Sequence, residues 1–299
     1  MAPPERAHPK FADAEAARTE SAPAKVNLYL HLRGRQSDGY HLLDSLAVFP
    51  AIGDRLSTAP GRGLSLNIVG FFSAGLSTEP DNLVLRAARA LATAHGLTPN
   101  AALRLEKNLP VASGIGGGSS DAAAALRLLS RLWGVAIPHG LALTLGADVP
   151  VCLDAPQPRL MAGIGDRLSP APPMPNFWMV LVNPGVGVAT GTVFAAVEQR
   201  DNAPGPPPPA GLRGFAALIE WLARQRNDLQ AAAVSICPVI AEVLTALGDA
   251  PIARMSGSGA TCFALHDRQA TAVAQAERLR RARPGWWIVA APVAATPAR

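Results

Sequence analysis

The stretch Leu109-Pro110-Val111-Ala112-Ser113-Gly114-Ile115-Gly116-Gly117-Gly118-Ser119-Ser120-Asp121 runs directly into an alanine-rich segment, residues 122–133, whose leucines have helical spacing. A glycine- and serine-rich loop that leads into a helix can direct several backbone N–H groups, two hydroxyls and the positive end of the helix dipole at one point. Because that arrangement suits a phosphate group, the stretch predicts a phosphate-binding loop, and we interpret it as the triphosphate site of a kinase.

Two familiar phosphate motifs do not fit this loop. The P-loop requires Gly-x-x-x-x-Gly-Lys-Ser/Thr, and no lysine stands before Ser119 or Ser120. The dinucleotide motif Gly-x-Gly-x-x-Gly fails because Gly114 and Gly116 are followed by Ser119, where the third glycine is required. The loop is therefore neither a Walker loop nor a Rossmann turn.

A flexible linker is the simplest alternative for a glycine-rich run. Ser119, Ser120 and Asp121, however, are favourable N-cap and first-turn residues, and the apolar positions then continue at helical spacing. We expect Asp121 to cap the helix, since a carboxylate at that position should point back along the first turn. The loop is thus predicted to belong to a capped helix start.

Composition fits a large globular protein. The chain has 299 residues, 49% of them hydrophobic, and a formal net charge of +5. The densest basic segment, residues 278–283, is interpreted as a solvated helix face because it contains no run of five basic residues. The positive charge also suits an anionic substrate.

The cysteines indicate a reducing compartment. Cys152, Cys237 and Cys262 are odd in number, far apart and set among apolar residues, so we expect reduced core residues and neither disulfides nor a Cys-x-x-Cys metal site. The first twenty residues contain four carboxylates and no long apolar core, and no apolar run of eighteen residues follows. These observations predict a cytoplasmic protein that does not bind membranes.

Alternating apolar residues predict a half-buried strand over residues 24–32, with Lys25, Asn27 and Tyr29 on one face. Further strands are expected near residues 42–48, 54–58, 64–69 and 102–106, and a helix near 82–95. A second helix should begin at Pro138 and end at Gly146, followed by a turn at 147–150 and a strand at 151–153. This order is typical of an α+β fold.

The domain organisation follows from the prolines. The stretch 169–175 is interpreted as the connection to a second lobe that begins with a strand at 178–182. We therefore divide the chain into an irregular N-terminal extension (1–20), a first lobe with the phosphate loop (21–168) and a second lobe (169–299). The proline-rich segment 203–209 is expected to be an inserted surface loop with polyproline character.

Four further motifs accompany the loop: Pro23-Ala24-Lys25-Val26-Asn27-Leu28, Asp38-Gly39-Tyr40-His41, Leu145-Gly146-Ala147-Asp148-Val149-Pro150 and Arg254-Met255-Ser256-Gly257-Ser258-Gly259-Ala260. In order and spacing the set resembles the GHMP kinases, over roughly residues 21–290. The resemblance implies an ATP-dependent kinase of two lobes, the first similar to the second domain of ribosomal protein S5 and the second ferredoxin-like. It also implies Mg²⁺, bound mostly by phosphate oxygens and water, with Ser119 or Ser120 as the candidate protein ligands.

The resemblance assigns roles to individual residues. Asp148 falls at the position of the catalytic aspartate, which accepts the proton of the attacking hydroxyl, and Lys25 at that of the lysine that stabilises this carboxylate and orients the hydroxyl. The implied substrate contacts are Asn27, Tyr40, His41, Thr190 and Phe194, with Tyr40 and Phe194 as two halves of an aromatic sandwich around a base. The implied ATP contacts are Lys107, Pro110, Val111, Ala112, Ser113, Gly114, Ile115, Gly116, Gly117, Gly118, Ser119, Ser120, Ser256, Gly257, Ser258 and Gly259.

The loop sequence also favours one branch of the family. The common superfamily loop is Gly-Leu-Gly-Ser-Ser-Ala, whereas residues 114–121 contain additional glycines and end in Asp121. This variant resembles the branch that phosphorylates the 2-hydroxyl of a cytidine diphosphate-linked methylerythritol, in the non-mevalonate route to isoprenoid precursors. The implied partners are ATP and that cytidine diphosphate-linked polyol, with no nucleic acid.

Other interpretations stay open at this point. A GHMP kinase for a smaller alcohol is the nearest alternative, and the Tyr40-His41 pair argues against it. An RNA-binding protein with an S5-like domain would need exposed aromatics among basic residues, and aromatics are 5% of the chain. A catalytically inactive nucleotide sensor is disfavoured because Lys25 and Asp148 are both present. Sequence does not decide between a monomer and a weak homodimer.

Overall fold

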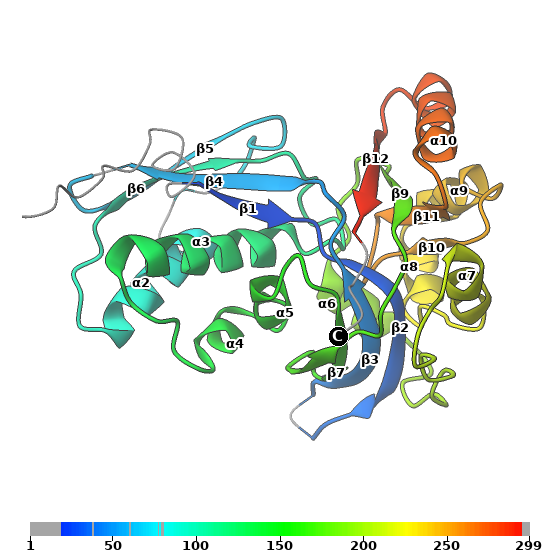
Figure 1. Ribbon diagram of the computed structural model, residues 1–299, viewed down its shortest axis with the longest axis horizontal. Helices are drawn as coiled ribbons and strands as arrows, with labels where there is room; N and C mark the ends of the chain where they lie inside the picture. Colours follow the sequence, from blue (N-terminus) through cyan, green and yellow to red (C-terminus); the bar gives the residue numbers. More distant parts are fainter. Residues whose placement is uncertain (1–18, 38, 60, 77, 79–80, 295–299) are drawn as a thin grey trace, which may run out of the picture.

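The computed structural model describes residues 19–37, 39–59, 61–76, 78 and 81–294. Two lobes lie side by side with a curved sheet between them (Figure 1). Helices and strands are mixed along the chain, so the predicted two-lobed α+β architecture is confirmed.

The first lobe is built on a four-stranded sheet in the order β1-β4-β6-β5. Its strands are β1 (Thr19–Pro23), β4 (Gly53–Ala59), β6 (Ala101–Glu106) and β5 (Leu64–Val69). β5 and β6 run parallel, since the chain between them crosses back through helix α2 (Leu83–Ala94). Helices α2 and α3 (Gly117–Trp133) cover one face of the sheet (Figure 1) and bury a core rich in alanine and leucine against it.

The central sheet has the order β2-β3-β7-β8, with β2 (Val26–Arg35), β3 (His41–Val48), β7 (Arg159–Gly163) and β8 (Arg167–Pro170). The prediction of a half-buried strand is wrong for β2, which is buried on both faces from Val26 to Leu32 because it lies between the lobes. A register shift in its pairing with β3 separates Asn27 from Tyr29, and Tyr29 packs on Trp221. Lys25 and Asn27 therefore keep a common side without Tyr29.

The second lobe contains an antiparallel sheet in the order β10-β11-β9-β12. Its strands are β9 (Phe177–Asn183), β10 (Ala253–Met255), β11 (Cys262–His266) and β12 (Trp287–Val293). Its helices are α6 (Thr190–Ala196), α7 (Phe215–Ala223), α8 (Gln230–Ile236), α9 (Val239–Ala246) and α10 (Gln269–Ala282). The sheet and helices enclose a second apolar core.

The start of α3 differs from the prediction. The N-cap is Gly116, in the left-handed conformation at φ 65°, and no side chain caps the helix. The helix thus begins before Ser119, and the expected capping role of Asp121 is wrong because its carboxylate is engaged by Lys107. A β-carbon at Gly116 would also lie 3.2 Å from the Lys25 side chain, so the absence of a side chain lets the helix start approach that lysine.

Two other local predictions are corrected. The helix expected from Pro138 is only α4 (Leu141–Leu145), and the strand expected at residues 151–153 is part of a short helix, α5 (Val149–Leu153). A short apolar run has no periodicity that separates a buried strand from a buried helical turn.

The domain limits also shift locally. Residues 1–18 of the predicted extension lie outside the described residues, and Thr19 and Glu20 belong to β1. β8 crosses the predicted boundary at 168/169 and pairs with β7, so the connection to the second lobe starts after Pro170.

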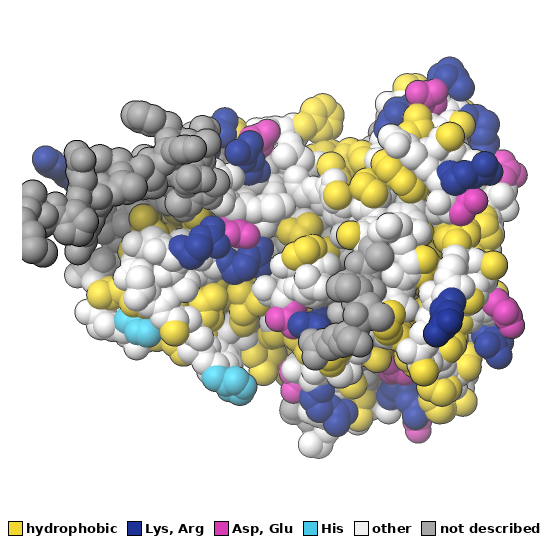
Figure 2. All heavy atoms as spheres, in the orientation of Figure 1, with side chains coloured by type: hydrophobic (Ala, Val, Ile, Leu, Met, Phe, Trp, Pro, Cys, Tyr) yellow, Lys and Arg dark blue, Asp and Glu magenta, His cyan; other side chains and the backbone are white. Residues whose placement is uncertain are grey.

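The surface fits the interpretation of residues 278–283 as a solvated helix face. Basic and acidic side chains are interspersed over α10 in Figure 2, and Arg278 pairs with Asp249.

The three cysteines are free thiols, two of them buried. Within the part of the chain that the structure describes, no helix combines the length and apolarity needed to cross a bilayer.

Candidate active site

A cavity of about 1050 Å³ opens where the two lobes and the central sheet meet. Most of the residues predicted for the site line it, although they come from segments far apart in the sequence. They are Lys25, Asn27, Tyr40, His41, Lys107, Pro110, Val111, Ala112, Ser113, Gly114, Gly116, Gly117, Gly118, Ser119, Asp148, Thr190, Phe194, Gly257 and Ser258. The exceptions are Ile115, Ser120, Ser256 and Gly259.

One end of the cavity is formed by the start of α3. The N–H groups of Gly117, Gly118 and Ser119 precede the first intrahelical hydrogen bond, and no side chain caps them. The first backbone bond of the helix runs from the Ser120 N–H to the Gly116 carbonyl. Three uncapped N–H groups and the positive end of a helix of 17 residues thus face one point, which is an arrangement that binds phosphate.

The two glycine motifs lie in direct backbone contact. A β-carbon at Gly114, where φ is 74°, would lie 2.6 Å from the Gly259 carbonyl oxygen. The Ser256 hydroxyl donates to the Gly114 carbonyl at 3.1 Å, and the Thr261 N–H donates to the Ser113 carbonyl. The second motif therefore serves as a support that fixes the shape of the first.

The four predicted residues that do not line the cavity have structural roles. Ile115 is fully buried, and its carbonyl accepts the Lys25 N–H at 2.9 Å. The Ser120 hydroxyl donates to the Pro23 carbonyl at 2.6 Å, so with its N–H also bonded Ser120 has neither group to offer to a nucleotide. Ser256 and Gly259 support the loop as described above.

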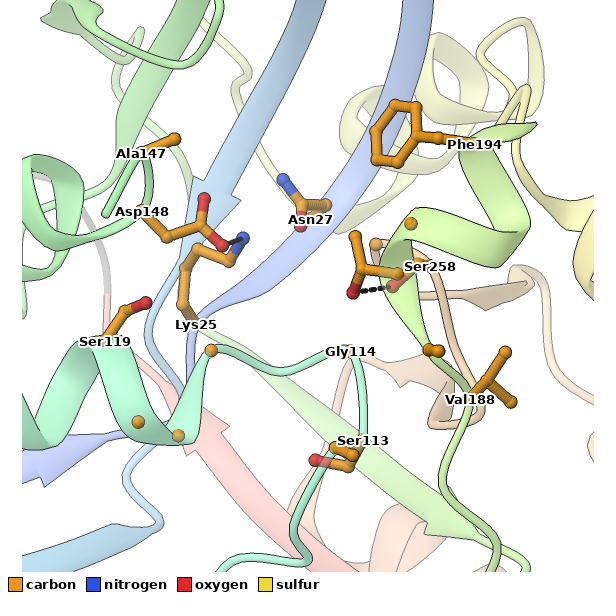
Figure 3. A pocket seen from close by; sticks show the side chains of 18 of the residues that line it. Lys25, Asn27, Ser113, Gly114, Ser119, Ala147, Asp148, Val188, Phe194 and Ser258 are labelled. Carbon is orange, nitrogen blue, oxygen red and sulfur yellow. Dashed lines mark hydrogen bonds and ion pairs between the residues drawn. The ribbon is translucent and has the colours of Figure 1, made fainter. Parts of the chain in front are cut away.

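Lys25 and Asp148 form an ion pair on the cavity wall (Figure 3), with 2.7 Å between Lys25 Nζ and Asp148 Oδ2. Lys25 lies in the chain just before β2, and Asp148 occupies the N-cap position of α5. The Lys25 side chain is 5% exposed and that of Asp148 37% exposed. Asp148 is thus fixed by a buried cation yet open to a ligand in the cavity.

Asn27 lies beside this pair. Its amide Nδ2 donates to Ser45 Oγ at 2.7 Å, and its backbone N–H donates to Ser256 Oγ at 3.2 Å. Its Oδ1 is buried and has no hydrogen-bond partner among the described residues. Because an unsatisfied buried acceptor is costly, Asn27 is well suited to accept a hydrogen bond from a bound molecule.

Lys107 lines the cavity, but two carboxylates engage its ammonium. Asp121 Oδ2 lies 2.7 Å from Nζ, and Asp54 is in even closer contact. Burial alone would lower the pKa of Lys107, but the two carboxylates raise it above its usual range. Burial and the neighbouring Asp54 raise the pKa of Asp121, and Lys107 opposes that rise. If Lys107 turned toward a bound phosphate, its buried carboxylates would lose their partner, at a cost of about 3–5 kcal/mol. A charged hydrogen bond to the phosphate would return only about 1.5–3 kcal/mol.

The opposite end of the cavity is aromatic. The rings of His41 and Phe194 lie 4.8 Å apart between centroids at an interplanar angle of 35°. Burial, with Arg35 and Arg200 nearby, lowers the pKa of His41, so its ring is neutral near pH 7. His41 Nε2 is buried without a hydrogen-bond partner among the described residues, and Tyr40 is 58% exposed at the cavity mouth.

Thr190 connects this end to the second glycine motif. Its hydroxyl lies 2.9 Å from that of Ser258, as the dashed line in Figure 3 marks. Asp38, which belongs to the same motif as Tyr40 and His41, lies outside the described residues.

Sequence reasoning did not identify several residues that shape the site. Asn227 donates from Nδ2 to the carbonyls of Met255, at 2.9 Å, and Gly257, at 2.8 Å, and so holds the second glycine motif. Arg35 and Arg200 line the aromatic end. No periodic or glycine-rich signal marks these positions, since their roles come from contacts between distant segments.

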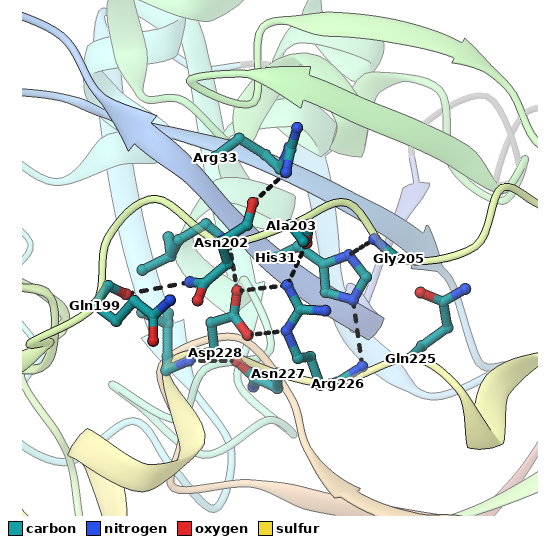
Figure 4. A network of polar contacts seen from close by, with 12 residues as sticks. His31, Arg33, Gln199, Asn202, Ala203, Gly205, Gln225, Arg226, Asn227 and Asp228 are labelled. Atoms are coloured by element: carbon teal, nitrogen blue, oxygen red, sulfur yellow. Dashed lines mark hydrogen bonds and ion pairs between the residues drawn. The ribbon is translucent and has the colours of Figure 1, made fainter.

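A polar network holds the wall of the second lobe against β2 (Figure 4). The Arg226 N–H and the Gly205 N–H each approach a ring nitrogen of the buried His31, and Asp228 accepts the Leu32 N–H at 2.8 Å. The proline-rich segment is part of this network, because the Pro206 carbonyl accepts hydrogen bonds from Trp221 and Gln225. The network joins β2 to the segment that carries Asn227.

The donors around the phosphate end suit a metal ion that is held mainly by phosphate oxygens. Among the described side chains, no three of His, Cys, Asp or Glu come together as a metal cluster. Ser119 lines the cavity at the start of α3, so its hydroxyl is an oxygen ligand of the kind that Mg²⁺ accepts.

Comparison with known proteins identifies both lobes. The protein-family model for the GHMP kinase N-terminal domain matches residues 82–155. The family model for the GHMP kinase C-terminal domain matches residues 211–284. The first match contains the phosphate loop and Asp148. The second contains Asn227 and the second glycine motif.

Relatives match along nearly the whole chain. A 4-diphosphocytidyl-2-C-methyl-D-erythritol kinase of Ruegeria pomeroyi is 56% identical over 272 residues, which cover 89% of this chain and 95% of that protein. One of Paramagnetospirillum magneticum is 52% identical over 279 residues, covering 90% and 96%. A crystal structure of 4-(cytidine 5'-diphospho)-2C-methyl-D-erythritol kinase aligns with a TM-score of 0.73 at 34% identity, covering 92% of this chain and 99% of that chain. The chain belongs to the GHMP kinase family.

Proposed function

We propose that this protein transfers the γ-phosphoryl group of ATP to the 2-hydroxyl of 4-diphosphocytidyl-2-C-methyl-D-erythritol, in the non-mevalonate route to isoprenoid precursors. Its relatives at 51–56% identity carry the name of that kinase and match about nine-tenths of the chain. The protein is thus an ATP-dependent small-molecule kinase of the GHMP family.

The observation that carries the chemistry is the position of the Lys25–Asp148 pair. It lies on the cavity wall between the start of α3 and the aromatic end (Figure 3). A substrate that places its base against His41 and Phe194 can therefore extend its alcohol toward Asp148, next to a phosphate at α3. One cavity accommodates donor, acceptor and base.

In this proposal Asp148 accepts the proton of the attacking hydroxyl. Its carboxylate is accessible, and the ion pair with Lys25 fixes its direction. Proton acceptance by a positioned carboxylate contributes about 10²–10⁴-fold in rate. Lys25 orients both the carboxylate and the incoming oxygen.

The phosphates of ATP are bound by the uncapped N–H groups of Gly117, Gly118 and Ser119. Mg²⁺, held by phosphate oxygens and the Ser119 hydroxyl, would neutralise charge on the phosphates. The phosphoryl group passes directly to the alcohol, and no residue of the chain becomes phosphorylated. Positioning supplies most of the catalysis in such a transfer.

Recognition of the acceptor falls to the aromatic end and Asn27. A base stacked on Phe194 gains about 1–3 kcal/mol. His41 Nε2 and Asn27 Oδ1, both buried and unpartnered among the described residues, are available for hydrogen bonds to the substrate. These contacts favour a nucleotide-linked alcohol over a smaller one.

Some parts of the proposal rest on the sequence alone. We place the protein in the cytoplasm, as a monomer or weak homodimer that binds neither nucleic acid nor membranes. We also keep the division into two lobes, with the connection moved to follow Pro170.

A coupled ADP-release assay tests the function. The acceptors are 4-diphosphocytidyl-2-C-methyl-D-erythritol and methylerythritol phosphate, which has the same polyol without the cytidine. We expect ATP- and Mg²⁺-dependent ADP release with the first acceptor only. Equal turnover of both acceptors, or turnover of mevalonate or homoserine instead, would contradict the proposed substrate.

A further inference from the structure

Three charged side chains are buried together beneath the phosphate loop. They are Asp54 on β4, Lys107 just after β6 and Asp121 in α3, and their side chains are 0%, 5% and 5% exposed. Lys107 Nζ contacts both carboxylates, at 2.7 Å for Asp121. The cluster therefore ties three elements of the first lobe to one ammonium.

The cluster also holds the backbone on both sides of the loop. The second oxygen of Asp54, Oδ1, accepts the N–H groups of Asn108 at 2.6 Å and Leu109 at 2.9 Å. These two residues immediately precede Pro110, where the loop begins, and Asp121 follows its end. Asp54 thus fixes the chain before the loop, and Lys107 connects Asp54 to the helix after it.

We propose that Asp54, Lys107 and Asp121 form a brace that sets the distance between the two ends of the phosphate loop, so that Lys107 positions ATP through the loop and does not contact it. Lys107 is then a positioning residue. The proposal depends on ATP binding at α3 but not on the identity of the alcohol.

The position of the ammonium supports this role. A β-carbon at Gly117 would lie 3.5 Å from Lys107 Nζ, so the ammonium packs under the first residue of α3. Asp121 Oδ1 has no hydrogen-bond partner among the described residues, so Asp121 depends on Lys107 for its pairing. Movement of Lys107 toward a phosphate would leave both buried carboxylates without their cation.

Substitution of Asp121 separates a brace from a direct ATP contact. In the D121L variant Lys107 loses one carboxylate and is freer to move. A brace predicts weaker ATP binding, because the helix start is no longer tied to Asp54. A direct contact between Lys107 and ATP predicts unchanged or tighter binding, because the ammonium is released toward the phosphates.

The readout is the Kd of a non-hydrolysable ATP analogue with Mg²⁺, measured by calorimetry on the full chain without any alcohol. The matched control is E20L, which breaks the other ion pairs of α3, those of Glu20 with Arg127 and Arg131. We expect D121L to raise the Kd about tenfold and E20L to change it less than twofold. D121N retains an oxygen that accepts from Lys107, so its Kd should stay within twofold.

Several results would overturn the brace. These are an unchanged or lower Kd in D121L, an equal rise in D121L and E20L, or an equal rise in D121L and D121N. If D121L does not fold, D121A provides the same test with a smaller side chain. Because no alcohol is present, a wrong assignment of the acceptor leaves this experiment unaffected.

Discussion

The two ends of the cavity are held by different kinds of interaction. At the phosphate end, two glycine motifs meet backbone to backbone, and the charged side chains beneath them are buried and paired. At the aromatic end, side chains form the wall of the cavity, with His41 against Phe194 and Tyr40 largely exposed. The first end is fixed by the main chain, whereas the second is formed by rings that can be exchanged without moving the main chain.

From this difference we expect the two ends to have separate functions. A loop whose shape depends on backbone contact tolerates no added atoms, so changes there should affect transfer to any alcohol. Changes at the aromatic end should alter which alcohol is used while ATP binding continues. Substitutions at each end, measured against both substrates, test this separation.

The largest effect is expected at the junction of the two ends. Asp148→Asn keeps the size of the side chain but removes the proton acceptor, so kcat should fall about 10²-fold or more while ATP binding persists. The matched control is Asp154→Asn, at the other end of α5, which removes the ion pair with Arg159 and should retain kcat. Turnover within threefold of the original in Asp148→Asn would remove Asp148 from proton transfer.

The next largest effect should come from Gly114→Ala. The added carbon would lie 2.6–2.7 Å from backbone atoms of Gly259 and Ser256, at a positive φ that alanine disfavours. We expect the KM for ATP to rise about tenfold or more. Gly134→Ala is the control, since Gly134 at the C-terminal end of α3 has a similar positive φ of 66° but its added carbon would meet nothing within 4 Å. An equal KM in the two variants would show that the contact between the motifs does not shape the ATP site.

The glycine loop at the start of α3 was predictable because its signal is local. A loop that needs close backbone approach requires glycine, and glycines adjacent in sequence at residues 114–118 are visible without a structure. The resemblance to the GHMP kinases then connected that loop to Lys25 and Asp148, which the structure places at 2.7 Å. The sheets were predictable for the same reason, since alternation along β4, β5 and β6 is local.

What the sequence did not reveal depends on distant contacts. Asp54, Lys107 and Asp121 lie on three separate elements, and no spacing rule joins them. Asn227 likewise acts on carbonyls of β10 and the second glycine motif. The start of α3 was misplaced because serine and aspartate usually cap helices, whereas here Gly116 takes that position and leaves the N–H groups uncapped.

At the aromatic end, Phe194→Ala should weaken the binding of the acceptor alcohol and leave the binding of ATP unchanged. Loss of a stacking surface worth about 1–3 kcal/mol raises the KM for the cytidine-linked substrate roughly 5–150-fold and leaves the KM for ATP unchanged. Phe71→Ala is the control, because Phe71 is 87% exposed and lies outside the cavity lining. A rise in the KM for ATP equal to that for the acceptor would contradict the separation of the two ends.

The smallest effect concerns the polar network that joins β2 to the second lobe. The buried His31 ring accepts a backbone N–H from Gly205 or Arg226, and a neutral imidazole can do so at one nitrogen only. Burial, with Arg226 nearby, lowers the pKa of His31, while Asp228 and Asp44 oppose this and Arg254 adds to it. An imidazolium would accept neither bond, so protonation should weaken the network between β2 and the segment that carries Asn227.

The sign of the pH dependence follows from that lowered pKa. In the unfolded chain the His31 ring has its ordinary pKa near 6.5. The stability that depends on the neutral ring is therefore fully present above that pH and is lost as the pH falls toward the lower pKa of the folded state. We expect His31 to contribute a fall in the Tm between pH 7 and pH 5. His31→Gln should reduce that fall, whereas His139→Gln, at an exposed position, should leave it intact. An unaltered pH profile in His31→Gln would mean that the second-lobe wall is held against β2 without the imidazole.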